Sequence, residues 1–254
     1  MRHTDYDSIA AGYDVRYRTY DYHEIKAALA NFLGDRPLHR VLEVGCGTGY
    51  WLSALAGKAL TIAGVDRSAQ MLARARGSGA SLVRASAEEV PFVDASFDRI
   101  VCINALHHFA PRSRFFAEAR RLLGSGGGLF NVGLDPHADR DSWWVYDYFP
   151  ETRGIDLERY PAVRTIRGEL ARAGFTWAES SEVQVLERVM PAQRAFDRGL
   201  VARSFTSQLA VLSEEEFDAG VSRLREEMDA AAQRGGELTL ASELHLFATT
   251  GWVA

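Results

Sequence analysis

The chain of 254 residues is poor in the features that mark secreted, membrane-spanning and nucleic-acid-binding proteins. Its two cysteines, Cys46 and Cys102, are too few for a disulfide framework or a cysteine zinc site. No apolar run is long enough to cross a bilayer, and the N-terminus lacks the apolar segment of a signal peptide. A formal net charge of −5 argues against a surface built to neutralise phosphates. We therefore expect a cytoplasmic protein that binds neither membranes nor nucleic acids.

The composition is that of a globular protein with a full core. Hydrophobic residues make up 47% of the chain, which suits one α/β domain with additions. Residues 40–56 are the most informative stretch, because an apolar β-branched run is followed by three glycines at alternate positions and then by a helical pattern. Strand, glycine turn and helix in this order present a loop to a ligand at the carboxyl end of a strand.

Two acids indicate the kind of ligand. A dinucleotide fingerprint needs a glycine where Tyr50 stands, and Glu43, two residues before Gly45, would repel a pyrophosphate. The carboxylate of Glu43 suits a cationic ligand instead. Asp66 follows the predicted strand 60–65, and an acid at the end of the second strand is placed to hold ribose hydroxyls.

Glu43, the glycine turn and Asp66 together resemble the first two motifs of the class I S-adenosylmethionine-dependent methyltransferases, of the small-molecule, methyltransferase-11-like type. The resemblance covers residues 38–134 well. It implies an α/β fold with a Rossmann-like, doubly wound, seven-stranded and mostly parallel sheet, an antiparallel last strand and a helical cap. It also implies S-adenosyl-L-methionine as the cofactor and S-adenosylhomocysteine as the product.

The same resemblance implies the cofactor contacts. Residues 86–98 follow the family pattern with one departure, because Ser86 stands where an aspartate usually accepts a hydrogen bond from the adenine amino group. A serine hydroxyl accepts that bond more weakly, and Glu88 is the nearby substitute. Asn104 is expected beside the methionine end of the cofactor. The expected cofactor-binding residues are Glu43, Gly45, Cys46, Gly47, Asp66, Arg67, Met71, Ser86, Ala87, Glu88 and Asn104.

Adjacent histidines follow the predicted fourth strand, where active residues of such sheets lie. His107 and His108 point in different directions, and no third histidine or acid completes a metal site, so we expect no metal. Either histidine has a suitable native pKa for a general base, and the other is expected to bond a backbone group. The resemblance places Tyr13 over the cofactor pocket as an orienting hydroxyl, with plain packing as the alternative.

Two insertions are predicted outside the shared core. Residues 135–164 gather five aromatic residues within seven positions, without the period of a strand or a helix. We interpret this segment as a substrate lid, with an aromatic plug under a long loop as the alternative. Residues 191–212 and 213–234 predict two helices that either cover the substrate side or form a homodimer face. The expected substrate-binding residues are Tyr17, Trp143, Trp144, Tyr146 and Tyr148.

The expected domains are a helical cap (1–36), a methyltransferase core (37–134, 165–190 and 237–254), a lid (135–164) and a helical insertion (191–236). The expected reaction is an SN2 methyl transfer to an O, N or C nucleophile of a small molecule. Three alternatives stay open. The chain could modify tRNA, since residues 106–109 are also similar to enzymes acting on wobble uridines. It could bind the cofactor without methyl transfer, or use the sulfonium electrostatically in another reaction.

Overall fold

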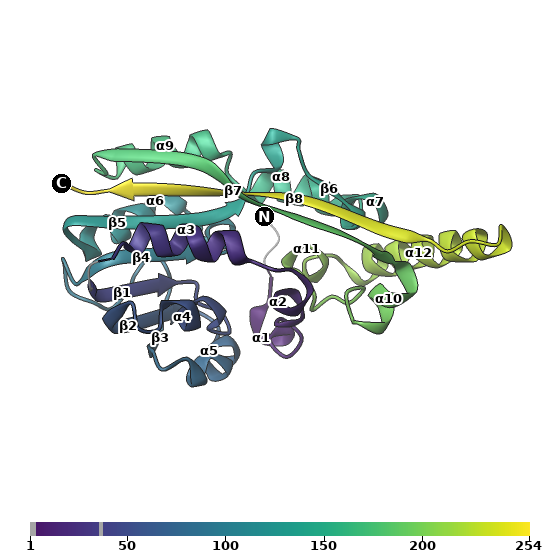
Figure 1. Cartoon of the computed structure of the whole chain (residues 1–254), viewed down its shortest axis with the longest axis horizontal. Coiled ribbons are helices and arrows are strands. Elements are labelled where there is room, and N and C mark those ends of the chain that lie inside the picture. Colours follow the sequence, from purple (N-terminus) through teal and green to yellow (C-terminus); the bar gives the residue numbers. More distant parts are fainter. Residues whose placement is uncertain (1–3, 36–37) are drawn as a thin grey trace. The chain divides into compact units, whose positions relative to one another are not determined.

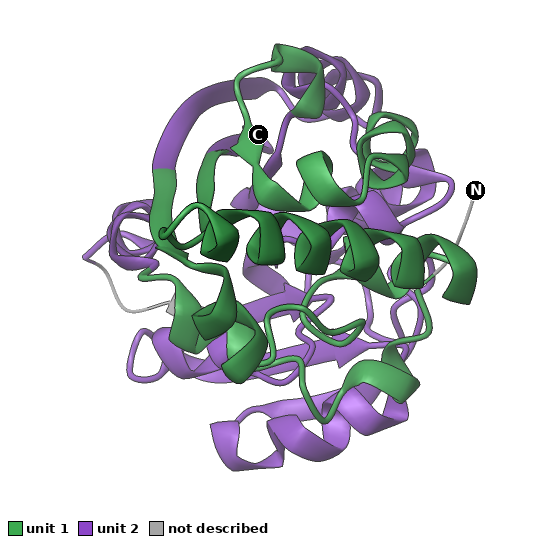
Figure 2. Ribbon diagram, turned by 90° about the vertical axis from the view of Figure 1, so that its right-hand side faces the viewer, with its two compact units in different colours: residues 1–21, 136–159, 185–245 green, residues 22–135, 160–184, 246–254 purple. Residues whose placement is uncertain are grey.

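The computed structural model describes residues 4–35 and 38–254. Residues 1–3, within the predicted cap, and residues 36–37, in the predicted linker to the first strand, lie outside the described residues. The chain forms two compact units, which Figure 2 colours separately. Unit 1 comprises residues 1–21, 136–159 and 185–245, and unit 2 comprises residues 22–135, 160–184 and 246–254. Each unit is described by itself.

Unit 2 is built on a mostly parallel sheet (Figure 1). Its parallel strands lie in the order β3-β2-β1-β4-β5, and their carboxyl ends share one edge. These strands are β1 (Leu38–Val44), β2 (Ala59–Asp66), β3 (Ser81–Arg84), β4 (Phe97–Ile103) and β5 (Leu123–Leu134). The order reverses beside β1, which is the switch point where ligands bind in such sheets.

Two long strands complete the sheet and continue into unit 1. Residues 246–252 of β8 (Thr239–Trp252) pair antiparallel with β5. On the other side β8 pairs with β7 (Trp177–Pro191), and the Thr176 N–H donates to the Trp252 carbonyl at 2.8 Å. The sheet also includes the two-residue strand β6 (Ser142–Trp143), antiparallel to β8 in unit 1. The predicted fold class is confirmed, with β6 as an addition.

Helices cover both faces of the sheet in unit 2. Neighbouring residues of a strand point to opposite faces: Leu129 belongs to a buried cluster with Phe116 and Leu170, whereas the Phe130 ring stacks on Phe32 at 5.2 Å between centroids. The helices are α3 (His23–Leu33), α4 (Tyr50–Leu55), α5 (Ala69–Ala75), α6 (Arg112–Leu122) and α9 (Val163–Arg172), with the 3-10 turns η1 (Arg76–Ser78) and η2 (Leu106–His108). Phe116 and Leu170 therefore anchor α6 and α9 to one face, and Phe32 anchors α3 to the other.

Unit 1 contains short helices and one long one. They are α1 (Tyr6–Ile9), α2 (Val15–Thr19), the 3-10 turn η3 (Pro136–Ala138), α7 (Trp144–Tyr148), α8 (Glu151–Arg159), α10 (Ala192–Asp197), α11 (Ser207–Ala210) and α12 (Glu214–Gln233). The core of the unit includes Phe149, which is fully buried and stacks on Phe217 of α12 at 5.6 Å. A Cβ at Gly220 would lie 2.2 Å from the Phe149 ring, so a glycine is needed for this close packing.

Some helices differ from the prediction. The capping box of Ser213 and Glu216 begins α12 as expected, but the single helix predicted over residues 191–212 is wrong. That segment folds as α10 and α11, because Gly199 takes a positive φ of 71° after the first and the Thr206 side chain caps the second. Residues 4–20 likewise form two short helices. Over the described ranges, no helix is both long enough and apolar enough to cross a membrane.

Candidate functional site

The glycine turn after β1 is held in a shape that side chains would disturb. Gly45, Gly47 and Gly49 all have positive φ angles, of 74°, 53° and 84°. The N–H groups of Gly45 and Cys46 both donate to the Val65 carbonyl, at 2.8 and 3.0 Å. A Cβ at Gly45 would lie 2.4 Å from the Ala105 Cβ. The turn therefore lies tightly between β2 and the segment after β4, with no room for a side chain at Gly45.

Glu43 is a buried acid with an unsatisfied oxygen. It is 1% exposed, and its Oε2 has no hydrogen-bond partner among residues 4–35 and 38–254. Burial and, secondarily, the nearby charge of Asp66 raise the pKa of Glu43 well above its usual range. An unsatisfied buried carboxyl is costly, and a cation placed beside it removes that cost. This side chain thus fits the positively charged end of S-adenosylmethionine.

Asp66 has a different environment at the end of β2. Its two carboxylate oxygens accept hydrogen bonds from the Gly47 and Ser68 N–H groups, each at 2.9 Å. Burial raises the pKa of Asp66, and these backbone hydrogen bonds oppose the rise. Asp66 therefore joins the glycine turn to the start of α5.

The other residues predicted to bind the cofactor lie at the ends of neighbouring strands. The Ser86 hydroxyl donates to the Glu88 carboxylate, whose second oxygen accepts from the Ala110 N–H at 3.1 Å. The pair thus forms one polar group after β3. Asn104 follows β4 with a positive φ of 53°, and its N–H donates to the Val132 carbonyl. Cys46, Met71 and Ala87 are buried, whereas Arg67 is exposed.

The two histidines differ in exposure and partners. His107 is 5% exposed, and its Nε2 is hydrogen-bonded to the Tyr160 hydroxyl at 3.1 Å, with the two rings stacked 3.9 Å apart. His108 is half-buried beside it. The sequence did not single out Tyr160, because it lies in an irregular segment 53 residues away. Burial also raises the pKa values of the Cys46 and Cys102 thiols, so neither suits a nucleophile.

The geometry agrees with the comparisons to known proteins. The methyltransferase-11 family model, described as a methyltransferase domain, matches residues 42–131. A phthiotriol/phenolphthiotriol dimycocerosates methyltransferase of Mycobacterium ulcerans is 32% identical over 176 residues, which are 67% of this chain and 62% of the relative. The chain belongs to the class I S-adenosylmethionine-dependent methyltransferases. The prediction of S-adenosylmethionine as the cofactor is therefore confirmed.

Two further comparisons place this methyltransferase chain among relatives. A ubiquinone/menaquinone biosynthesis C-methyltransferase of Acidiphilium cryptum is 27% identical over 210 residues, covering 67% of this chain and 80% of the relative. A crystal structure described as that of a methyltransferase from an antibiotic biosynthesis pathway of Anabaena variabilis superposes with a TM-score of 0.72 at 19% identity, over 93% of this chain and 99% of that one. The latter shows the fold alone. The chain spans about three fifths of the length of the first two curated relatives, 62% and 56%.

The remaining predicted site residues of this methyltransferase chain lie in unit 1. The Tyr13 hydroxyl accepts from the Arg16 guanidinium at 2.6 Å, and the Tyr13 and Tyr17 rings meet edge to face. Trp143 and Trp144 are buried, so the aromatic segment contributes to the core of the unit. The hydroxyls of the half-buried Tyr146 and Tyr148 donate to Asp156 at 2.9 Å and Glu227 at 2.6 Å. Among the described residues no cluster of histidines, cysteines and acids could hold a metal ion.

Proposed function

We propose that the chain transfers the methyl group of S-adenosylmethionine to a nucleophile of a small molecule. The observation that carries the proposal is the glycine turn flanked by two acids, with the Glu43 oxygen unsatisfied and the Asp66 carboxylate bonded to the turn. When bound, the cofactor supplies an electrophilic methyl group on a sulfonium leaving group. The protein then has to align the acceptor with that methyl, exclude water and take a proton where the nucleophile loses one.

We assign the cofactor contacts to residues at the carboxyl ends of four neighbouring strands. Glu43 faces the cationic end, Asp66 binds the ribose hydroxyls, and the pair of Ser86 and Glu88 binds the adenine amino group. Met71 lines the adenine side and Asn104 the methionine side. Each polar assignment uses a group whose hydrogen-bonding capacity matches the part of the cofactor it receives, whereas Met71 supplies an apolar contact.

For the acceptor proton, His108 is the better general-base candidate. His107 is buried and already bonded through Nε2 to Tyr160, whereas His108 is half-buried at the same turn. We propose Tyr13 as an orienting hydroxyl. The proposed acceptor contacts are Tyr17, Trp143, Trp144, Tyr146 and Tyr148. We also propose the division into cap, core, lid and helical insertion, in which residues 191–236 either cover the substrate side or form a homodimer face.

The proposal is tested by calorimetric titration with S-adenosylhomocysteine. We expect micromolar binding to the wild type and a loss of tenfold or more, roughly 1.4 kcal/mol, in Asp66→Ala. Asp66→Asn removes the charge and retains an acceptor oxygen for only one of the two backbone N–H groups, so it should loosen the turn less than Asp66→Ala does. Asp229→Ala, an exposed position on α12, is the matched control and should bind like the wild type. Absence of binding to the wild type would refute the proposal.

Methyl transfer itself requires a product. Incubation with S-adenosylmethionine and a panel of phenols, amines and quinones, followed by mass spectrometry, should show one compound that gains a methyl group in place of a hydrogen. His108→Ala should then slow the transfer to a hydroxyl acceptor more at low pH than at high pH, where the acceptor ionises unaided. A tRNA acceptor would instead show binding that weakens steeply with salt.

A further inference from the structure

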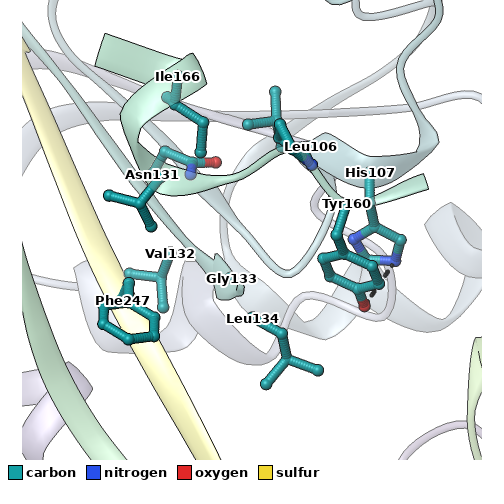
Figure 3. A pocket seen from close by; sticks show the side chains of 11 residues that line it. Leu106, His107, Asn131, Val132, Gly133, Leu134, Tyr160, Ile166 and Phe247 are labelled. Atoms are coloured by element: carbon teal, nitrogen blue, oxygen red, sulfur yellow. Dashed lines mark hydrogen bonds between the residues drawn. The ribbon is translucent and has the colours of Figure 1, made fainter. Parts of the chain in front are cut away.

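A small pocket in unit 2 has a polar side chain that nothing in the proposed cofactor site uses. The pocket lies where η2, the carboxyl end of β5, residues 160–166 and β8 meet (Figure 3). Its enclosed space is about 10 Å³, room for one water-sized group such as a hydroxyl, so the rest of a ligand would lie at its open mouth. Its lining is mainly apolar, with Leu106, Ile166 and Phe247 among the side chains labelled in Figure 3. The polar side chains of the lining are those of Asn131, His107 and Tyr160.

Asn131 lines this pocket with an unsatisfied acceptor. The side chain is 2% exposed, and its Oδ1 has no hydrogen-bond donor in the described part of the chain. Its neighbours across the sheet are Cys102 on β4 and Thr249 on β8. The Thr249 hydroxyl is already paired with the Ser180 hydroxyl at 2.9 Å. A buried acceptor left without a donor costs free energy in the absence of a ligand, so its persistence needs a reason.

The wall formed by His107 and Tyr160 is ordered by their mutual contacts. The stacked rings are inclined by 16°, and the Tyr160 hydroxyl is hydrogen-bonded to His107 Nε2. Figure 3 shows this bond as a dashed line at one side of the pocket. The pair gives the pocket a flat aromatic side. The lining residues include neither Lys, Arg, Asp nor Glu, so the pocket has no permanent charge.

We propose that this pocket binds a neutral hydroxyl group of the methyl acceptor, with the hydroxyl donating to Asn131 Oδ1. The inference rests on the proposed function and narrows its acceptor to a compound that carries a hydroxyl on an apolar or aromatic frame. A carboxylate or phosphate is disfavoured because the Asn131 oxygen would repel it and no cation lines the pocket. An ammonium group is disfavoured because no carboxylate would compensate its desolvation.

The proposal predicts opposite effects of one substitution on stability and on binding. Asn131→Leu replaces the unsatisfied amide oxygen with apolar atoms in a side chain of similar size, so the unliganded protein should melt at a higher temperature. The same variant should bind a hydroxyl compound less well. A purely structural asparagine would behave differently, since its removal would lower the melting temperature. Thr249→Val, which breaks the neighbouring hydroxyl pair outside the pocket, is the matched control.

The experiment uses phenol and toluene as probes, because they share a ring and differ in the donor. Binding to the full chain is measured by NMR titration. We expect phenol to bind the wild type about fivefold more tightly than toluene, as one hydrogen bond allows. Asn131→Leu should abolish that preference, and Thr249→Val should keep it. Equal binding of the two probes to the wild type, or a preference that survives in Asn131→Leu, would overturn the assignment.

Titration of the same samples with S-adenosylhomocysteine separates this inference from the proposed function. Cofactor binding without a phenol preference overturns the pocket assignment alone. A phenol preference without cofactor binding overturns the proposed function, and with it the role of the pocket in acceptor binding, while the hydroxyl site itself stands.

Discussion

Replacing Gly45 with alanine should damage the glycine turn in two separable ways. A φ of 74° is left-handed and costs an alanine about 1–2 kcal/mol. In addition, the new Cβ would lie 2.4 Å from the Ala105 Cβ, and overpacking of this kind costs about 1–3 kcal/mol. We therefore expect Gly45→Ala to lower the free energy of unfolding by about 2–5 kcal/mol. Because the strain lies in the cofactor turn, the affinity for S-adenosylhomocysteine should fall by tenfold or more.

A second glycine of unit 2 provides the control. Gly57 has a φ of 76°, and a Cβ there would meet nothing within 4 Å, so Gly57→Ala should show the backbone cost alone and bind the cofactor normally. Adding Ala105→Gly to Gly45→Ala should remove most of the difference in unfolding free energy and cofactor affinity between Gly45→Ala and Gly57→Ala. The assays are urea unfolding and calorimetric titration. If Gly45→Ala matched Gly57→Ala in both, the turn would accommodate a side chain and the reasoning from close approach would be refuted.

Two other predictions follow from buried groups. Burial and the charge of Asp66 raise the pKa of Glu43, so the folded state holds this proton more tightly than the unfolded state, whose glutamates titrate near about 4.3. The stability that Glu43 contributes is therefore present below that pH and is lost as the pH rises through the higher folded pKa. In Glu43→Gln the melting temperature should consequently depend less steeply on pH. A slope equal to that of the wild type would contradict this. In unit 1, Gly220→Ala should lower the melting temperature by pushing a Cβ into the Phe149 ring, whereas Gly154→Ala in α8 meets nothing within 4 Å and should raise it through better helix propensity. Equal melting temperatures for these two variants would contradict the packing argument.

The parts of the fold that the sequence predicted are those specified by local signals. Strand β1, the glycine turn and α4 follow from an apolar run, three glycines and a helical pattern, and Ser68 caps α5 as its position indicated. The capping box of Ser213 and Glu216 located α12 for the same reason. In each case the residues that determine the structure are neighbours in sequence.

The parts that the sequence could not predict depend on distant contacts. The helix expected over 191–212 breaks because Gly199 and Thr206 act as end signals, which helical periodicity alone did not reveal. Asn131 lies within an apolar strand and belongs to no recognisable sequence motif. It stands out only in the structure, where its Oδ1 has no hydrogen-bond donor among the described residues. Tyr160 becomes informative only through its stacking on His107. The aromatic segment also had two interpretations, since no local rule says which rings become core.

Two unsatisfied acceptors in unit 2 point to ligands of different charge. Glu43 Oε2 on β1 and Asn131 Oδ1 on β5 are both buried, and neither has a donor among the residues described. In the unliganded state at neutral pH each lowers the stability of the fold, and binding of a matching group reduces this cost. An acid suits a cationic partner, whereas an amide oxygen in an uncharged pocket suits a neutral hydroxyl. If both inferences hold, a single bound ligand should remove only one cost. The cofactor product and a hydroxyl compound should then raise the melting temperature additively, and Asn131→Leu should abolish the second increment alone.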